Sequence, residues 1–172
     1  MIHNQIAARL EHAFSQHGFA EPSVAELKTA AGVSLRTLYR QFPSKQAMVM
    51  GALQHRHLRY FEFLAEGEPA PGIASMTHLF QRLAEWMKNH APNGCMSMGA
   101  FAAFPGNQDI QDLVKHHKAE MIAVMARRSG REEVARELFL LHEGASAAWP
   151  LLGMDVIHSA EKAAVLLISG EK

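Results

Sequence analysis

The stretch that decides the fold is residues 23–45, which read SVAELKTAAGVSLRTLYRQFPSK. It opens with a capping box, in which the Ser23 hydroxyl can accept from the backbone of Glu26 while the Glu26 carboxylate reaches back to the amide of Ser23. A helix is therefore predicted to start at Ser23. Gly32 is expected to end it, because glycine suits the left-handed position that follows a helix.

A second short helix is predicted directly after the first. Ser34 is the expected N-cap, and Pro43 ends the helix because the residue before a proline disfavours helical geometry. Ser44 then caps a long following helix. Two short helices joined by a turn that contains glycine are typical of the helix-turn-helix, whose second helix enters the major groove of DNA.

The second helix of this pair has two chemically different sides, because successive residues are about 100° apart. Its apolar side comprises Leu35, Leu38 and Phe42. Its polar side comprises Arg36, Thr37, Arg40 and Gln41, with Tyr39 at the flank. Arginine can bond two acceptors of guanine, glutamine can pair with adenine, and the threonine methyl can contact thymine. This side therefore has the chemistry that reads DNA bases.

A phosphate-binding site is expected beside this second helix, which is called the reading helix below. Lys45 and the free amides at the start of the next helix favour an anion, and the Tyr39 hydroxyl could reach a second phosphate. The candidate DNA-contacting residues are Ser23, Ser34, Leu35, Arg36, Thr37, Tyr39, Arg40, Gln41 and Lys45.

Residues 23–45 closely resemble the DNA-binding signature of the tetracycline-repressor (TetR/AcrR) family. The segments AGVS, LY and FPSK stand at the family's spacing, and the preceding helix with Phe14 and Gly18 also fits. The resemblance covers residues 5 to about 60. Lys28 departs from it, since the family usually has a small residue packed between helices at that position.

The resemblance implies a two-domain, all-α protein. Residues 1–47 are expected to form a helix-turn-helix DNA-binding domain, and residues 48–172 a helical ligand-binding and dimerisation domain. It also implies a ligand-responsive repressor that binds a palindromic operator in double-stranded DNA as a homodimer. Gly94-Cys95-Met96 resembles an element at the start of the sixth helix in many family members.

The remaining chain also predicts helices, because apolar residues recur at helical spacing and no stretch alternates with period two. Helices are expected over 77–89, 108–128, 131–149 and 156–168, with Pro150 ending the third. The fold class is therefore all-α.

Aromatic and methionine side chains in this region could line a pocket for a small, largely apolar effector. The candidate ligand-binding residues are Phe80, Met87, Cys95, Phe101, Phe104, Met121, Met125 and Trp149. Ordinary core packing is the alternative for each of them. Cys95 follows Gly94 at an expected helix start, where amide dipoles can activate a thiol, although a buried and inert cysteine is the competing interpretation.

A homodimer is expected from small residues that allow close helix approach. They occupy residues 144–148, and a similar seam follows the last helix through Val156, Ala160, Ala163, Ala164 and Leu167. Helices with such seams can meet across a two-fold axis. The alternative is that these faces close the core of the monomer.

Charge is distributed unevenly along the chain. Residues 1–60 carry seven Lys and Arg against three acidic residues, whereas the rest carries ten against fourteen. The basic first part favours a polyanionic partner, although a chance imbalance on a solvated surface is the alternative. No apolar run reaches the roughly 20 residues of a membrane span, and no secretory signal precedes the first helix. A cytoplasmic protein is expected, with one cysteine and therefore no internal disulfide.

Signatures of other functions are weak. The sequence has no Gly-rich phosphate loop, no Gly-x-Ser-x-Gly and no His-Glu-x-x-His, so neither catalysis nor a cofactor is expected. His55 with His57, and His116 with His117, do not place both rings on one helical face, so no metal site is expected. The competing hypothesis is a helical binding or catalytic protein without a DNA function, whose basic first part is incidental.

Overall fold

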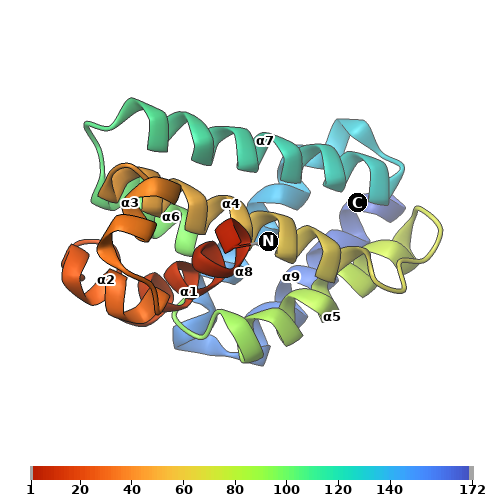
Figure 1. The fold of residues 1–172 in the computed structure, drawn as a ribbon. Coiled ribbons are helices and arrows are strands. Elements are labelled where there is room, and N and C mark those ends of the chain that lie inside the picture. The colour runs from red at the N-terminus through yellow and green to blue at the C-terminus, as the bar shows by residue number, and fades with distance from the viewer. Residues whose placement is uncertain (1, 171–172) are drawn as a thin grey trace. The chain divides into compact units, whose positions relative to one another are not determined.

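The structure, a computed structural model, describes residues 2–170, and these form helices without a strand. In chain order the elements are α1 (Ile2–His17), α2 (Val24–Ala31), α3 (Leu35–Gln41), α4 (Lys45–Ala65), α5 (Ile73–His90), α6 (Met96–Ala103), α7 (Gln108–Ser129), the 3₁₀ turn η1 (Glu132–Val134), α8 (Ala135–Leu152) and α9 (Met154–Ser169) (Figure 1). The all-α prediction is confirmed. No helix within residues 2–170 is long and apolar enough to cross a membrane.

The chain divides into two compact units. The first unit contains the chain up to Tyr60 together with Met96–Lys115, and the second contains Phe61–Cys95 together with His116–Lys172. The chain therefore passes between the units inside α4, just before α6, and inside α7. The assignment of residues 1–47 and 48–172 to two functional domains remains a prediction. The compact first unit differs from it, because this unit also includes the first part of α4.

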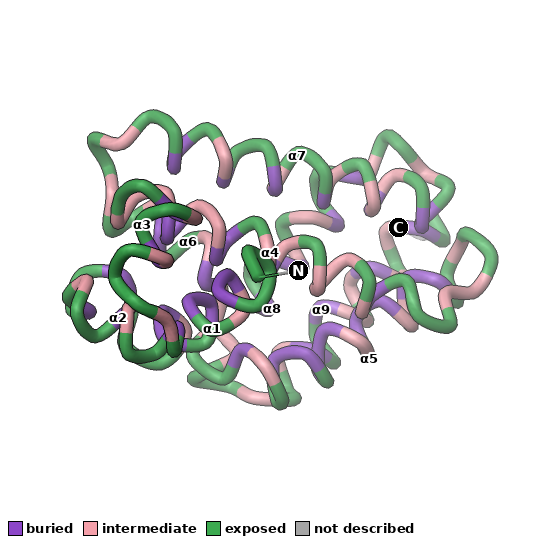
Figure 2. Tube along the Cα trace, viewed as in Figure 1, coloured by how far each residue is buried: buried purple, intermediate pink, exposed green. Residues whose placement is uncertain are grey.

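The first unit is organised around one apolar core. Helix α1 buries one face because its apolar residues recur at helical spacing. In Figure 2, buried residues (purple) and exposed residues (green) recur along the helices. The core contains Ile6, Leu10, Phe14, Phe19, Leu27, Ala31, Leu38, Phe42, Met48, Val49, Leu53, Ala100, Ile110 and Val114. Helix α6 and the start of α7 thus pack with the three N-terminal helices.

The second unit is built mainly from α5, α8 and α9, with α9 in contact with both of the others. Its buried residues include Met76, Leu79, Phe80, Leu83, Leu138, Ala145, Ile157, Ala160, Ala164 and Ile168. Ala145, Ala160 and Ala164 therefore help to close the core of this unit. For these three residues, core packing is the correct interpretation and not the predicted dimer seam.

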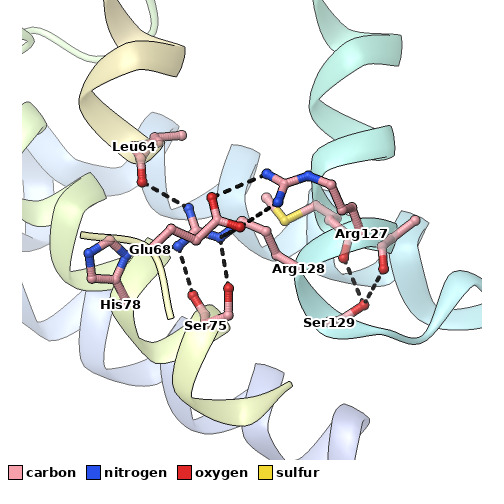
Figure 3. Close-up of polar contacts among 9 residues, drawn as sticks. Leu64, Glu68, Ser75, His78, Arg127, Arg128 and Ser129 are labelled. Carbon is pink, nitrogen blue, oxygen red and sulfur yellow. Dashed lines mark hydrogen bonds and ion pairs between the residues drawn. The ribbon is translucent and has the colours of Figure 1, made fainter. Parts of the chain in front are cut away.

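A fully buried arginine also stabilises the second unit. The Arg128 side chain at the end of α7 is 0% exposed and donates to the Leu64 carbonyl, to Ser75 Oγ, to the Ser75 carbonyl and to His78 Nδ1, at 2.8–3.1 Å (Figure 3). These contacts satisfy a guanidinium that would otherwise be costly to bury. Arg128 thereby joins the ends of α4 and α7 to the start of α5.

One predicted helix boundary is wrong. The helix expected over residues 131–149 with a stop at Pro150 is instead a 3₁₀ turn followed by α8, which continues through Pro150 to Leu152. A proline removes one hydrogen bond to the carbonyl four residues earlier. In the last turn this loss does not end the helix, because only two further residues follow before Gly153 closes it.

Candidate nucleic-acid interface

The turn between α2 and α3 is defined by local hydrogen bonds. Ser23 Oγ accepts from the Glu26 amide at 3.3 Å, and the Ser23 amide donates to Glu26 Oε2 at 2.8 Å, which completes the predicted capping box. These hydrogen bonds from Ser23 to the carboxylate lower the pKa of Glu26. Gly32 ends α2 in the left-handed conformation with φ of 64°, and its amide donates to the carbonyls of Lys28 and Thr29. Both predicted ends of α2 are confirmed.

Arg9 of α1 stabilises this turn through a hydrogen bond to the end of α2. Its Nη1 donates to the Ala31 carbonyl at 2.7 Å, and a Cβ atom on Gly32 would lie 2.6 Å from the same nitrogen. Glycine suits this position because of its positive φ, and a side chain there would displace the Arg9 guanidinium. Sequence reasoning missed Arg9, since nothing near it in the chain shows that it reaches the end of α2.

The second helix of the pair, α3, is capped as predicted. Ser34 Oγ accepts from the Thr37 amide at 3.1 Å, and the two hydroxyl oxygens are 3.0 Å apart. Phe42 follows α3 in extended geometry directly before Pro43. These contacts start and end a helix of seven residues within the first unit.

The exposure of α3 separates a buried side from an accessible side. Leu38 is 0% exposed and Phe42 is also buried, so they hold α3 in the core. Leu35 is 46% exposed, so the core does not cover the whole apolar side of α3, and Leu35 stays accessible as a candidate DNA contact. It belongs to the first turn of α3, where the core no longer covers the helix. The accessible residues are Ser34, Leu35, Arg36, Tyr39 and Arg40, with Thr37 and Gln41 half-buried.

The predicted phosphate-binding site at the start of α4 has an additional role. Ser44 Oγ accepts from the Ala47 amide at 3.0 Å, so Ser44 caps α4 as predicted. Lys45 Nζ donates to the carbonyl of Ala20 at 3.3 Å. The half-buried Lys45 side chain therefore also ties the start of α4 to the loop before α2, a contact that spans 25 positions of the sequence.

The predicted effector-binding residues are divided between the two units. Phe80, Met87, Met121 and Met125 are buried in the second unit, where Cys95 and Trp149 are half-buried. Phe101 and Phe104 pack against the core of the first unit, and the Phe104 ring lies 6.2 Å from that of Phe19. The structure therefore does not gather all of these side chains in one unit, and their role as a pocket stays a prediction.

Residues 6–50 match the bacterial regulatory proteins of the tetR family. The fold is similar to that of a TetR-family transcriptional regulator from Streptomyces coelicolor, with a TM-score of 0.80 at 18% identity over 96% of this chain and 90% of that one. A TetR transcription regulator from Haloarcula marismortui is similar with a TM-score of 0.79 at 15% identity, over 98% of this chain and 97% of that one. No curated protein matches the chain in sequence. Residues 6–50 thus form a DNA-binding domain of the tetR type, and the chain as a whole has the fold of TetR-family transcriptional regulators.

Proposed function

We propose that this chain is a ligand-responsive repressor that binds a near-palindromic operator as a homodimer. The observation that carries the proposal is the arrangement of α3, which buries Leu38 and leaves Arg36 and Arg40 exposed on a helix that is capped and fixed at both ends. An exposed basic face on the second helix of a helix-turn-helix has the chemistry for base and phosphate contacts in the major groove.

Within this proposal some of the exposed residues contact bases and others contact phosphates. Arg36 and Arg40 read bases, because a guanidinium can bond two guanine acceptors at once. Thr37 and the half-buried Gln41 contribute at the same face. Tyr39 binds phosphate, and so do the amides at the start of α4, since helix N-termini favour anions. Ser23, Ser34 and Leu35 are exposed and complete the proposed set of DNA contacts.

The experiment is selection of DNA from a random library with the purified protein, followed by titration of the selected duplex. Arg36→Ala and Arg40→Ala should each weaken specific binding by about 1–3 kcal/mol if they read bases. Arg136→Ala is the matched control, because Arg136 is an exposed arginine of α8 in the second unit. Affinity should also fall steeply with salt, because phosphate contacts release counterions.

Two results would contradict this reading of the site. Selection that yields no enriched sequence would favour the helical protein without a DNA function. Equal binding by the wild type and both arginine variants would show that another surface binds DNA.

The proposed dimer surface is an exposed apolar stripe on α8. Leu140, Gly144, Ala147 and Leu151 are all exposed and follow each other at spacings of four, three and four residues. This spacing puts them on one face of the helix. Two small residues between two leucines allow a second copy of the same helix to approach closely, as an isologous interface requires. Leu151 is 85% exposed, which is costly for a leucine that no partner covers.

The proposed effector is a small, largely apolar molecule bound in the second unit. The buried methionines and aromatics there are adaptable apolar side chains. Helix α4 starts beside the reading helix and continues into the second unit after Tyr60, so a change in its tilt would move the two reading helices of a dimer. Two half-sites are about 34 Å apart or a multiple of this, so a small change in spacing lowers specific affinity.

Titration of operator-bound protein with candidate apolar compounds tests this part. Operator and effector should oppose each other reciprocally, with a coupling of about 1–3 kcal/mol. A compound that binds the second unit without any change in operator affinity would contradict the coupling.

A further inference from the structure

A groove lies between α1 and α2 in the first unit. Its volume is about 520 Å³, within the range of about 300–1,000 Å³ that is usual for small-molecule sites. The lining comes from α1, α2 and the loop between them, and it includes no residue of α3 or α4. The groove is therefore separate from the residues of α3 that are proposed to read DNA.

Small side chains leave this space open between the two helices. Ala8 and Ala13 of α1 and Ala30 of α2 line the groove, and each of these side chains ends at Cβ. Larger residues at such positions would fill the space, because packed helices leave few voids. Leu27 also belongs to the lining and is 0% exposed, so the groove has an apolar floor that is part of the core.

One end of the groove is cationic. Arg9 lines it there, next to the end of α2, because its Nη1 donates to the Ala31 carbonyl. This contact uses one of the five N–H donors of a guanidinium, so further donors can bind a carboxylate of a ligand.

The other end of the groove is anionic. It is lined by Glu21, which precedes α2, and by Glu26 in the first turn of α2. The hydrogen bonds from Ser23 go to Glu26 Oε2 and lower the pKa of Glu26, so this side chain is a carboxylate at neutral pH whose Oε1 can accept from a ligand. His17 lines the same end, and a neutral imidazole there can accept from the same cation.

The distance between the two ends fits a short extended peptide. Arg9 and His17 line opposite ends and are eight positions apart on α1, which corresponds to about 12 Å at about 1.5 Å per residue. An extended chain spans about 3.3–3.6 Å per residue, so three residues and their two charged ends cover this length. His12 and Gln16 line the middle of the groove, where they can bond the peptide groups of such a ligand.

We propose that the groove binds a zwitterionic molecule of the size of a tripeptide. Its carboxylate pairs with Arg9, its ammonium pairs with Glu21 and Glu26, and its apolar body lies on the floor that Leu27 forms. The charges at the two ends of the groove complement the two charges of such a ligand. This site lies in the first unit, so it is distinct from the apolar effector site proposed for the second unit.

The site also has a consequence for DNA binding, which rests on the repressor function proposed above. Arg9 is the link, because its contact with the Ala31 carbonyl stabilises the end of α2 directly before the turn into α3. A ligand carboxylate competes with this carbonyl for the guanidinium. The turn that positions α3 is then held less firmly, and operator affinity falls.

Calorimetric titration of the full chain with trileucine at pH 7 tests the site without DNA. Amidation of the peptide's carboxyl end removes its anion, and acetylation of the amino end removes its cation. Each change should weaken binding about tenfold or more, because each removes a charge-assisted hydrogen bond. The proposal is overturned if all three peptides bind equally, or if trileucine does not bind at millimolar concentration.

Three variants locate the peptide on the protein. Ala30→Trp should weaken binding because the indole occupies the groove, and Ala25→Trp is the matched control, since Ala25 is exposed on the same helix and lies outside the lining. Arg9→Met should bind the amidated peptide as well as it binds trileucine, because the group that distinguishes them is lost. Thermal melts confirm that each variant is folded.

Two results with folded variants would place the peptide on another surface and overturn the site. The first is equal binding of trileucine by Ala30→Trp and Ala25→Trp. The second is an Arg9→Met protein that still prefers trileucine to its amide.

Operator affinity tests the regulatory consequence. Saturating trileucine should weaken binding of the selected duplex about tenfold, within the usual range of allosteric coupling. Amidated trileucine at the same concentration is the control and should leave the affinity unchanged. Equal affinity with and without trileucine overturns the regulatory half. If the protein alone binds no DNA, the proposed repressor function fails, and the calorimetric titrations still decide the site.

Discussion

The carboxylate of Glu11 in α1 accepts a hydrogen bond of 2.6 Å from the guanidinium of Arg59 in α4. The same buried carboxylate lies 2.6 Å from His55 Nδ1 and accepts from Arg56 Nη1 at 3.1 Å. Burial alone would raise the pKa of Glu11, but the hydrogen bonds from His55 and Arg59 outweigh it and the pKa is lowered. Glu11 thus fixes α1 to α4 within the first unit.

Glu11→Ala should lower the free energy of unfolding by about 3 kcal/mol at pH 7, because it removes the buried carboxylate that pairs with Arg56 and Arg59. Urea denaturation measures the change. Glu21→Ala, an exposed glutamate of the same unit, should change stability by less than about 0.5 kcal/mol. Since the lowered pKa stabilises the fold above about pH 4.5 and this is lost as pH falls, Glu11→Gln should flatten the acid limb of the stability curve. An unchanged acid limb would contradict the assignment.

His78 should make the stability of the second unit depend on pH. Burial and the neighbouring Arg128 lower its pKa, and its Nδ1 accepts from Arg128 Nη2 at 2.8 Å, so the folded state needs neutral His78 (Figure 3). The unfolded chain then binds the proton first, so stability falls as pH drops below about 6.5. His78→Asn keeps an acceptor and should reduce this slope in urea denaturation between pH 7 and 5. An identical slope in both proteins would show that other groups cause it.

Gly51→Ala should destabilise the first unit although alanine favours helices. A Cβ on Gly51 would lie 2.2 Å from Cε1 of the buried Phe42 ring. The ring must move, and Phe42 directly follows α3. The cost should reach about 1–3 kcal/mol of overpacking, against a helix-propensity gain of about 1 kcal/mol. Thermal melts measure the balance, with Gly99→Ala as control because Gly99 lies in α6 of the same unit and a Cβ there would make only an ordinary contact, 3.8 Å from Phe19 Cε2. A higher melting temperature for Gly51→Ala would refute the packing argument.

Leu151→Glu should convert the proposed dimer into monomers. The charge would be buried against the second copy of α8 without a partner, which costs several kcal/mol. Sedimentation equilibrium measures the mass, and Leu58→Glu is the control because Leu58 is also exposed, at 55%, on α4. A dimer that persists in Leu151→Glu would place the interface elsewhere, and a monomeric wild type would exclude it.

The helix-turn-helix was determined almost entirely by local sequence. The Ser23 capping box, the left-handed Gly32 and the Ser34 cap each depend on groups within about four residues along the chain, so their geometry follows from residue type. The exposure of Arg36 and Arg40 follows from the same helical periodicity.

Other features required the tertiary structure. Periodicity orients a helix, but its neighbours decide how far its face is covered, so Leu35 proved exposed. Pro150 lies inside α8 because the missing hydrogen bond falls in the last turn. The contacts of Glu11 with Arg59 and of Lys118 with Cys95 join positions 48 and 23 residues apart. Such pairs form only when packing brings two helices together, and no local property of either residue selects its partner.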